Sequence, residues 1–232
     1  MHLRKVTFHP DRFPVRDRYP FSLEILHRTP CLEFTRPVTF FAGENGTGKS
    51  TVLKAIARAA GIHIWGEIEH SRVERNRYEE ALFQTLGLEW ADGPAPGSFF
   101  ASQSFRNYAV LLDEWAAADP MQLDRFNGKS PLAQSHGQSL MSYFRSRYGI
   151  RGLYFLDEPE TALSPRSQLE LLDLLDQMGR AGHAQFLIAS HSPLLLACPG
   201  AEILSFDTAP IRPIAYWDTE HYRVYKRFLE EH

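Results

Sequence analysis

Residues 43–50 read Gly-Glu-Asn-Gly-Thr-Gly-Lys-Ser, and they match every fixed position of the pattern G-x-x-x-x-G-K-[ST]. Glycines in such a loop let the backbone curl so that successive N–H groups point at phosphate oxygens. The lysine can reach the β- and γ-phosphates of a nucleotide, and the hydroxyl after it can ligate Mg²⁺. We therefore predict a phosphate-binding P-loop. Its nucleotide contacts are expected from Gly43, Asn45, Gly46, Thr47, Gly48, Lys49, Ser50 and Thr51.

The sequence on either side of this loop fits the same interpretation. The apolar run 37–42 suits a buried strand, and residues 50–58 have helical spacing, so a phosphate would lie at a helix N-terminus. The alternative is a glycine-rich turn that matches by accident. At average glycine frequency, a chain of this length would match about once in a hundred cases.

Composition limits the class of protein. The 232 residues are 44% hydrophobic and 12% aromatic, which is enough for a real core and favours one domain over residues 1–232. The formal net charge of −3 gives no basic field for DNA or RNA, although a local patch is not excluded. The two cysteines lack zinc or disulfide spacing, no run approaches about 18 apolar residues, and the N-terminus does not resemble a secretory signal. We expect a cytoplasmic protein without a transmembrane segment of its own.

Apolar periodicity divides the chain into a strand-rich core and a helical insertion. In residues 1–41, apolar stretches at 3–8, 21–26 and 32–34 predict short strands that are partly antiparallel. After residue 152, strands alternate with a helix, which predicts a parallel sheet. The core is expected at 1–61 and 150–232, and the insertion at about 62–149. Predicted strands lie at 153–156, 185–190 and 203–206, and predicted helices at 67–86, 105–118, 138–148, 165–179 and 219–231.

Two carboxylates and a histidine follow predicted strands. Asp157 and Glu158 end an apolar strand and would lie at the sheet edge where the P-loop opens. Asp157 is expected to hold Mg²⁺, and Glu158 to act as general base for an attacking water. His191 follows the next strand and can contact the γ-phosphate and orient that water. A simple turn before Pro159 is the alternative for the carboxylates.

The order of these motifs along the chain resembles that of the ATP-binding-cassette (ABC) ATPases: a P-loop, then Asp-Glu-Pro, then a histidine after the next strand. The stretch Asp-Glu-Pro-Glu-Thr-Ala-Leu-Ser-Pro-Arg and the compact length resemble a group of small, soluble bacterial ATPases. These are labelled predicted AAA-family ATPases, and their nucleotide core is related to the DNA-repair and chromosome-maintenance branch. The resemblance implies an α/β fold with a mostly parallel central sheet flanked by helices, an N-terminal antiparallel β portion and a helical insertion subdomain.

The resemblance also implies roles for residues that spacing alone would not single out. Gln103 would be the glutamine-loop ligand of Mg²⁺ and water, and Tyr19 the aromatic that stacks on adenine, with Phe13 and Phe21 as competitors. Ser135, Gly137 and Gln138 would form the signature motif, in which Gln134 replaces the usual leucine and His136 the first glycine. Ser164 stands where the D-loop usually has aspartate. The expected ligands are ATP and Mg²⁺. Because the signature would cap ATP bound by a second copy, the chain is expected to form a homodimer, and it would also have an unknown effector as partner.

Three other functions remain open at this point. The chain could be the nucleotide-binding subunit of a membrane transporter, although such motors usually carry a cleaner signature and an aspartate in the D-loop. It could act on nucleic acid in repair or defence, with Arg72, Arg75 and Arg77 as candidate phosphate contacts, but interleaved glutamates favour a solvated helix. A small-molecule phosphotransferase would need neither the signature nor His191.

Overall fold

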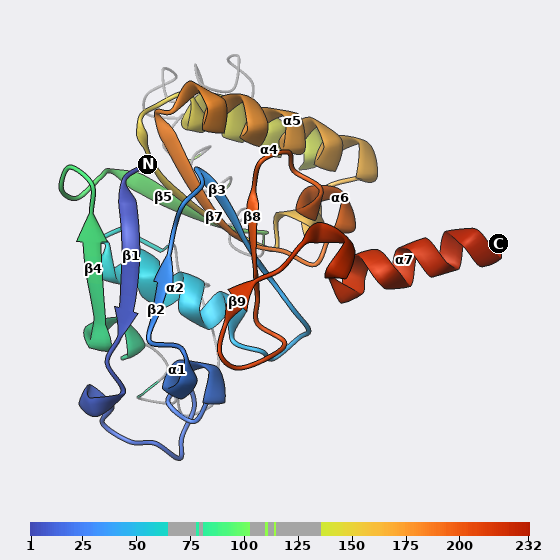
Figure 1. Cartoon of the computed structure of the whole chain (residues 1–232). Coiled ribbons are helices and arrows are strands. Elements are labelled where there is room, and N and C mark those ends of the chain that lie inside the picture. Colours follow the sequence, from blue (N-terminus) through green and yellow to red (C-terminus); the bar gives the residue numbers. More distant parts are fainter. Residues whose placement is uncertain (65–77, 79–80, 103–109, 111–113, 115–135) are drawn as a thin grey trace.

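The computed structural model describes residues 1–64, 78, 81–102, 110, 114 and 136–232. A six-stranded sheet in the order β5-β6-β7-β3-β8-β9 forms the centre of this part (Figure 1). Strands β5, β6, β7, β3 and β8 run parallel, and β9 pairs antiparallel with β8. The bounds are β3 Val38–Ala42, β5 Gly97–Ala101, β6 Gly152–Asp157, β7 Ala184–Ala189, β8 Glu202–Ser205 and β9 Arg212–Pro213. The predicted α/β fold with a mostly parallel sheet is confirmed.

A second, antiparallel sheet has the order β2-β1-β4. It consists of β1 Leu3–Phe8, β2 Cys31–Glu33 and β4 Leu86–Trp90. Buried Gln185 of β7 joins this sheet to the parallel one. Its Oε1 accepts hydrogen bonds from the backbone N–H groups of His2 and Leu3 at 2.7 and 2.8 Å, and its Nε2 donates to the Leu3 carbonyl at 2.9 Å.

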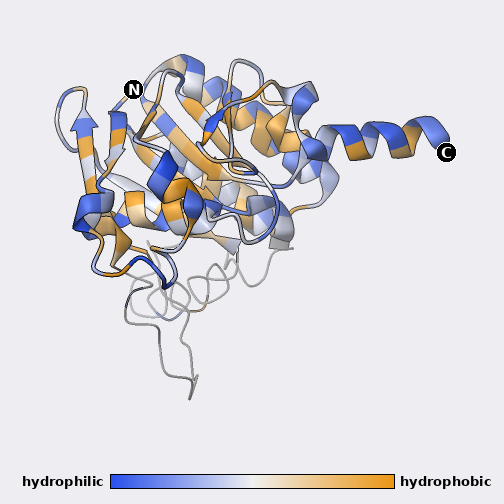
Figure 2. Ribbon diagram, turned by 60° about the horizontal axis from the view of Figure 1, so that its bottom comes forward, coloured by the Kyte–Doolittle hydropathy of each residue, from blue (hydrophilic) through white to orange (hydrophobic). Residues whose placement is uncertain are grey.

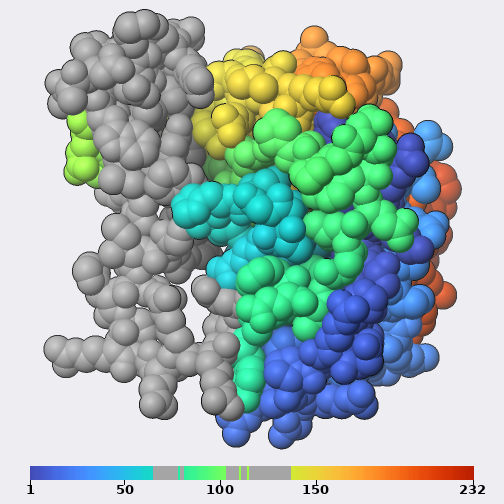
Figure 3. Space-filling view, turned by 90° about the vertical axis from the view of Figure 1, so that its left-hand side faces the viewer, coloured from blue at the N-terminus to red at the C-terminus, as the bar shows by residue number. Residues whose placement is uncertain are grey.

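Helices cover both faces of the parallel sheet. Helix α2 and the antiparallel sheet lie on one face, and α4 and α5 lie on the other (Figure 1). The space-filling view in Figure 3 shows the β4 region (green) between the N-terminal segments (blue) and the end of α2 (cyan). The helix bounds are α1 Glu24–Arg28, α2 Lys49–Ala59, α4 His136–Tyr148, α5 Pro165–Ala181, α6 Pro193–Leu196 and α7 Glu220–Glu231, with 3₁₀ turns η1 Pro10–Arg12, η2 Leu82–Thr85, η5 Pro159–Ala162 and η6 Tyr216–Asp218.

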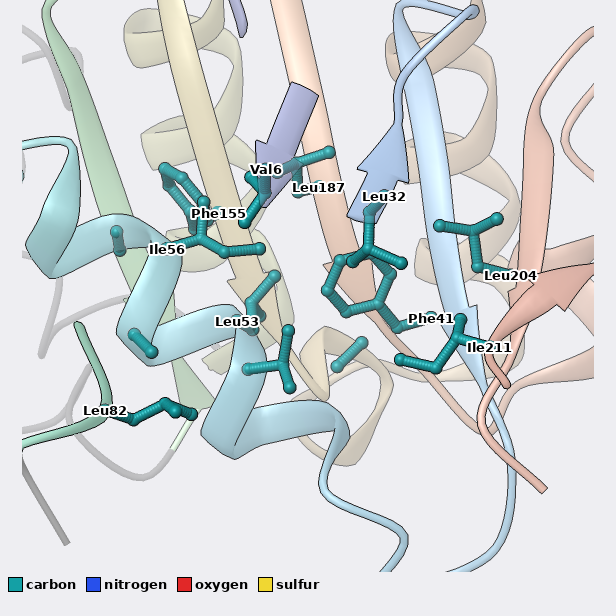
Figure 4. Packing of buried hydrophobic residues seen from close by; sticks show 14 of the residues in the cluster. Val6, Leu32, Phe41, Leu53, Ile56, Leu82, Phe155, Leu187, Leu204 and Ile211 are labelled. Carbon is teal, nitrogen blue, oxygen red and sulfur yellow. The ribbon is translucent and has the colours of Figure 1, made fainter. Parts of the chain in front are cut away.

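Alternation along the strands produces two hydrophobic cores. Phe41 and Phe155 point toward α2 and the antiparallel sheet, where they pack with Leu53, Ile56 and Val6 (Figure 4). Their neighbours Phe40 and Tyr154 point to the opposite face and pack against α4 and α5. Because both faces are covered, β3, β6 and β7 are fully buried, as expected for parallel strands.

Helix α7 extends away from the rest of the described chain (Figure 2). Its residues are exposed or half-buried, and an apolar stripe formed by Val224, Tyr225, Phe228 and Leu229 faces solvent. Within the described residues, no helix combines the length and apolar character needed to cross a bilayer.

Three expectations about local structure were wrong. Residues 21–26 do not form a strand, because Glu24 begins α1. The helix expected over 67–86 does not reach its predicted end, since Leu82–Thr85 is a 3₁₀ turn that leads directly into β4. Strands β4 and β5 lie inside the stretch assigned to a helical insertion, yet each belongs to one of the two sheets. The helix expected at 105–118 lies outside the described residues, apart from residues 110 and 114.

Candidate functional site

The carboxyl ends of the parallel strands bring the candidate residues to one edge of the sheet. The P-loop follows β3, Asp157 ends β6 and Glu158 comes next, and His191 follows β7 by two residues. Asp157 pairs in register with Ala189 of β7 and with Ala101 of β5. This edge is where open α/β sheets bind ligands, because the strand ends and helix N-termini meet there.

The P-loop has the backbone conformation that its glycines allow. Gly43 has φ +150°, and Gly48, which precedes the first residue of α2, has φ +97°. A Cβ at Gly43 would lie 2.9 Å from Oδ1 of Asp207, which also accepts a 2.7 Å hydrogen bond from the N–H of Glu44. A side chain at Gly43 is therefore opposed both by the backbone conformation and by Asp207.

Lys49 is buried inside this loop. Its Nζ donates to the carbonyls of Gly43 and Glu44 at 2.7 and 2.8 Å, so the ammonium group lies where the loop curls. Burial lowers the pKa of Lys49, and the nearby carboxylates of Glu158, Asp207 and Asp157 oppose that shift. A lysine ammonium group inside such a loop is a suitable contact for the terminal phosphates of a nucleotide.

Ser50 and Asp157 form a pair of oxygen ligands. Ser50 Oγ donates to Asp157 Oδ1 at 2.6 Å, and Nζ of Lys54 lies 3.8 Å from Asp157 Oδ2. Burial raises the pKa of the Asp157 carboxyl, while the Ser50 hydrogen bond and the Lys54 charge oppose the shift. A hard cation such as Mg²⁺ prefers oxygen ligands and would compensate a buried carboxylate, so these residues fit the metal expected there.

Glu158 has a left-handed backbone conformation, with φ 48° and ψ 55°. It is the only non-glycine residue with a positive φ in the part of the chain that the structure describes. Its N–H donates to the Ala189 carbonyl at 2.9 Å, and its carbonyl accepts from Ser102 Oγ at 2.7 Å and from Thr161 Oγ1 at 2.9 Å. Strained backbone held in this way is common at active sites.

His191 lies beside Glu158, with Nε2 3.8 Å from Glu158 Oε1. Its backbone N–H donates to Oε1 of Glu160 at 2.5 Å, and its Nδ1 is 3.1 Å from Nε2 of His221 in α7. Burial lowers the pKa of His191, and the nearby Lys49 and His221 add to the shift. The imidazole is therefore neutral at neutral pH.

The signature and D-loop candidates lie around the start of α4 and α5. Gly137 is in the first turn of α4, where a Cβ would meet Ser167 Oγ at 3.3 Å, and Gln138 beside it is exposed. Ser164 is the N-cap of α5 and accepts a hydrogen bond from the N–H of Ser167. Ser135 and Gln103 lie outside the described residues, although Gln103 follows β5 by two positions.

The structure separates the three aromatic candidates for adenine stacking. Phe21 is buried in the core, and Phe13 packs against it. Tyr19 is exposed, and its hydroxyl contacts Oγ1 of Thr51 in the first turn of α2. Of the three, Tyr19 is the ring that lies at the surface beside the P-loop helix.

Sequence reasoning missed three residues at this edge: Glu160, Asp207 and His221. Asp207 follows β8 and contacts the P-loop, so its position after a predicted strand was an available signal. Glu160 lies within the quoted Asp-Glu-Pro-Glu stretch. No local pattern pointed to His221, which reaches the site only because α7 begins next to His191.

This fold and this edge of the sheet define a P-loop nucleoside triphosphatase. Two family models match: "AAA domain, putative AbiEii toxin, Type IV TA system" over residues 137–197, and "AAA domain" over residues 24–81. These segments contain the carboxylates with His191 and the P-loop, respectively.

The chain is similar to curated proteins that are named as ATP-binding proteins of transport or import systems. The chain is 24% identical over 188 residues to the high-affinity branched-chain amino acid transport ATP-binding protein BraG of Pseudomonas aeruginosa, covering 75% of this chain and 79% of that protein. It is 28% identical over 169 residues to the thiamine import ATP-binding protein ThiQ of Photobacterium profundum, covering 65% of this chain and 66% of that protein.

Among solved structures, a "metal-chelate type ABC transporter" superimposes with a TM-score of 0.54 at 15% identity, covering 93% of this chain and 84% of that one. CbiO1 from Clostridium perfringens, part of the transporter complex cbiONQ, has a TM-score of 0.52 at 16% identity, covering 97% and 94%. At these identities the likeness establishes the fold. The family-model matches and the transport ATP-binding relatives support an ABC-type P-loop ATPase.

Proposed function

We propose that this chain hydrolyses ATP in a Mg²⁺-dependent reaction, with Glu158 as general base, and that two copies enclose the nucleotides between them. The observation that carries this proposal is the pair of contacts at the sheet edge. Ser50 and Asp157 are joined at 2.6 Å, and the Glu158 carboxylate faces His191 at 3.8 Å. One pair supplies oxygens for a metal, and the other supplies groups that can orient and deprotonate a water.

Each residue has a defined part in this reaction. Lys49 and the P-loop N–H groups bind the β- and γ-phosphates, and the start of α2 favours their negative charge. Ser50 and Asp157 would hold Mg²⁺, which supplies charge neutralisation on the phosphates when bound. Glu158 accepts the proton of the attacking water, His191 contacts the γ-phosphate, and Gln103 would contact metal and water.

The signature segment supports the proposed dimer. Gly137 and Gln138 lie in the first turn of α4, whose N–H groups and positive dipole end can face the γ-phosphate of a second copy. Ser135, which precedes α4 in the sequence, would add a hydroxyl. Because ADP lacks that phosphate, hydrolysis would weaken the contact between copies. The dimer would then act as a two-state switch whose balance depends on the bound nucleotide.

Light scattering on the Glu158→Gln variant tests this function. The variant keeps the side-chain shape but removes the base, so we expect a dimer with Mg-ATP and a monomer without nucleotide or with ADP. ATP hydrolysis should fall by about 10²–10⁴-fold, the usual contribution of a general base. The double variant Lys49→Ala/Glu158→Gln should stay monomeric because it cannot hold ATP. Wild-type hydrolysis by Glu158→Gln would refute the assigned base, and a monomer with bound ATP would refute the homodimer.

A second candidate function is the motor of a transporter. The relatives above are transport ATP-binding proteins by name, and their named cargoes differ. Co-purification with a membrane protein would favour this alternative, whereas hydrolysis stimulated by DNA would favour a role in nucleic-acid repair or defence.

A further inference from the structure

Helix α7 brings a second imidazole to the ATPase site. Nε2 of His221, in the first turn of α7, lies 3.1 Å from Nδ1 of His191. The two rings are tilted by 59° with centroids 5.3 Å apart, so the contact runs edge to edge through nitrogens and is not a stack. In this N···N hydrogen bond, one nitrogen must carry the proton and the other must accept it.

Both rings are neutral at neutral pH, because burial lowers the pKa of His221 as it does that of His191. A neutral imidazole has one N–H and one lone pair, so two arrangements of the His191–His221 contact are available. Either His191 carries its proton on Nδ1 and donates to His221, or His221 donates and His191 carries its proton on Nε2. The two arrangements present opposite groups to the site.

Glu158 distinguishes the two arrangements. His191 Nε2 is buried, has no hydrogen-bond partner among the described residues, and lies 3.8 Å from Glu158 Oε1. A proton on Nδ1 would leave the Nε2 lone pair facing a carboxylate, which is repulsive. A proton on Nε2 faces the carboxylate with an N–H and is attractive, and that N–H is also the group that can donate to a γ-phosphate oxygen.

We propose that His221 is a positioning residue of the ATPase site, whose Nε2–H donates to Nδ1 of His191 and keeps the His191 proton on Nε2. The backbone of His191 is already held by Glu160 Oε1, so His221 completes the orientation of the ring. This inference rests on the proposed roles of Glu158 and His191. It assigns to α7 a part in the chemistry that neither the P-loop nor the signature segment supplies.

Nitrogen-15 NMR of histidine-labelled wild-type protein tests the arrangement directly. Protonated and unprotonated ring nitrogens have well-separated chemical shifts, and the His191 signals are identified by their loss in His191→Gln. We expect His191 in the Nε2–H form and a scalar coupling between its Nδ1 and Nε2 of His221. An Nδ1–H form of His191 in the wild type would overturn the proposal.

Variants at His221 supply the functional test. His221→Ala should move the His191 proton toward Nδ1 and lower kcat by about 5- to 10-fold, the loss of one hydrogen bond, with the KM for ATP changed less than about twofold. His221→Gln retains an N–H donor and should restore most of both signals. His232→Ala, at the far end of α7, is the matched control and should change neither.

A His221→Ala protein that keeps the Nε2–H form and the wild-type kcat would refute the positioning role. The NMR measurement needs no ATP. A wild-type protein that fails to hydrolyse ATP would therefore refute the proposed function, while the tautomer result would still decide this inference.

Discussion

Ser50 and Asp157 are 107 residues apart in the sequence, yet Ser50 Oγ donates a 2.6 Å hydrogen bond to Asp157 Oδ1. The contact joins the first turn of α2 to the last residue of β6. Because Asp157 is buried, its charged form in the free protein depends on the Ser50 hydroxyl and on the ammonium groups of Lys54 and Lys49. Magnesium would take over that role when the nucleotide binds.

Replacing Ser50 by alanine should therefore weaken the metal site and leave the P-loop backbone intact. We expect the Mg²⁺ concentration for half-maximal hydrolysis to rise about tenfold or more, equivalent to about 1.4 kcal/mol. Metal titration of the hydrolysis rate measures this. Ser50→Thr keeps the hydroxyl and should behave like the wild type; equal metal dependence in all three proteins would contradict the assigned ligand.

Gly43→Ala tests the close approach of the P-loop to Asp207. The new Cβ would meet the Asp207 carboxylate at 2.9 Å and sit at a positive φ, so stability should fall by about 1–3 kcal/mol and ATP affinity should fall with it. Gly61→Ala is the matched control, because Gly61 also has a positive φ (+72°) but open space around it. It should lose about 1–2 kcal/mol of stability with ATP affinity unchanged. Denaturant unfolding and calorimetric ATP titration separate the two effects.

The left-handed backbone conformation of Glu158 predicts that glycine is a more stable replacement than alanine at this position. Glu158→Gly and Glu158→Ala should both lose hydrolysis, because both remove the carboxylate. The glycine variant should be about 1 kcal/mol more stable than the alanine variant, since glycine adopts φ 48° without a Cβ clash. Urea unfolding of the two variants is the measurement. Equal stability would mean that the backbone at this position has relaxed.

The neutral histidine pair predicts how stability depends on pH. The pKa values of His191 and His221 are lowered from 6.5 in the folded protein, so the unfolded chain takes up protons first as pH falls. The free energy of unfolding should therefore decrease as pH is lowered from about 6.5 through the folded pKa values. Melting temperatures between pH 7.5 and 5 should fall less steeply for His191→Gln/His221→Gln than for the wild type. The raised pKa values of Asp157 and Glu160 act in the opposite direction but are present in both proteins.

Local sequence was sufficient for the parts of the fold that depend on short spacing. The P-loop, the strand that ends at Asp157 and the helix at Pro165–Ala181 are continuous segments with strong apolar periodicity, so the parallel core was predicted correctly. Strands β4 and β5 were missed because both lie within residues 62–149, the stretch that the sequence assigned to a helical insertion. Their pairing with β1 and β6 is decided by contacts across the chain.

The candidate site likewise contains residues that local sequence could identify and residues that it could not. Lys49, Ser50, Asp157, Glu158 and His191 could be proposed because each follows a strand or belongs to a motif, and the structure brings them to one sheet edge. The roles assigned to them stay predictions. Glu160, Asp207 and His221 act on neighbours 31, 163 and 30 residues away, and no local pattern identifies which distant group a side chain will meet.

Helix α7 projects from the rest of the described chain and carries an exposed apolar stripe, so it is an obvious segment to remove when a more soluble protein is wanted. Cutting the chain after Thr219 would remove Phe228 and Leu229, which are 57% and 73% exposed. It would also remove the imidazole that contacts His191, because His221 is only two residues further along. A shortened form could therefore purify well, bind nucleotide normally and still give misleading turnover rates, so activity assays should be run on the full chain.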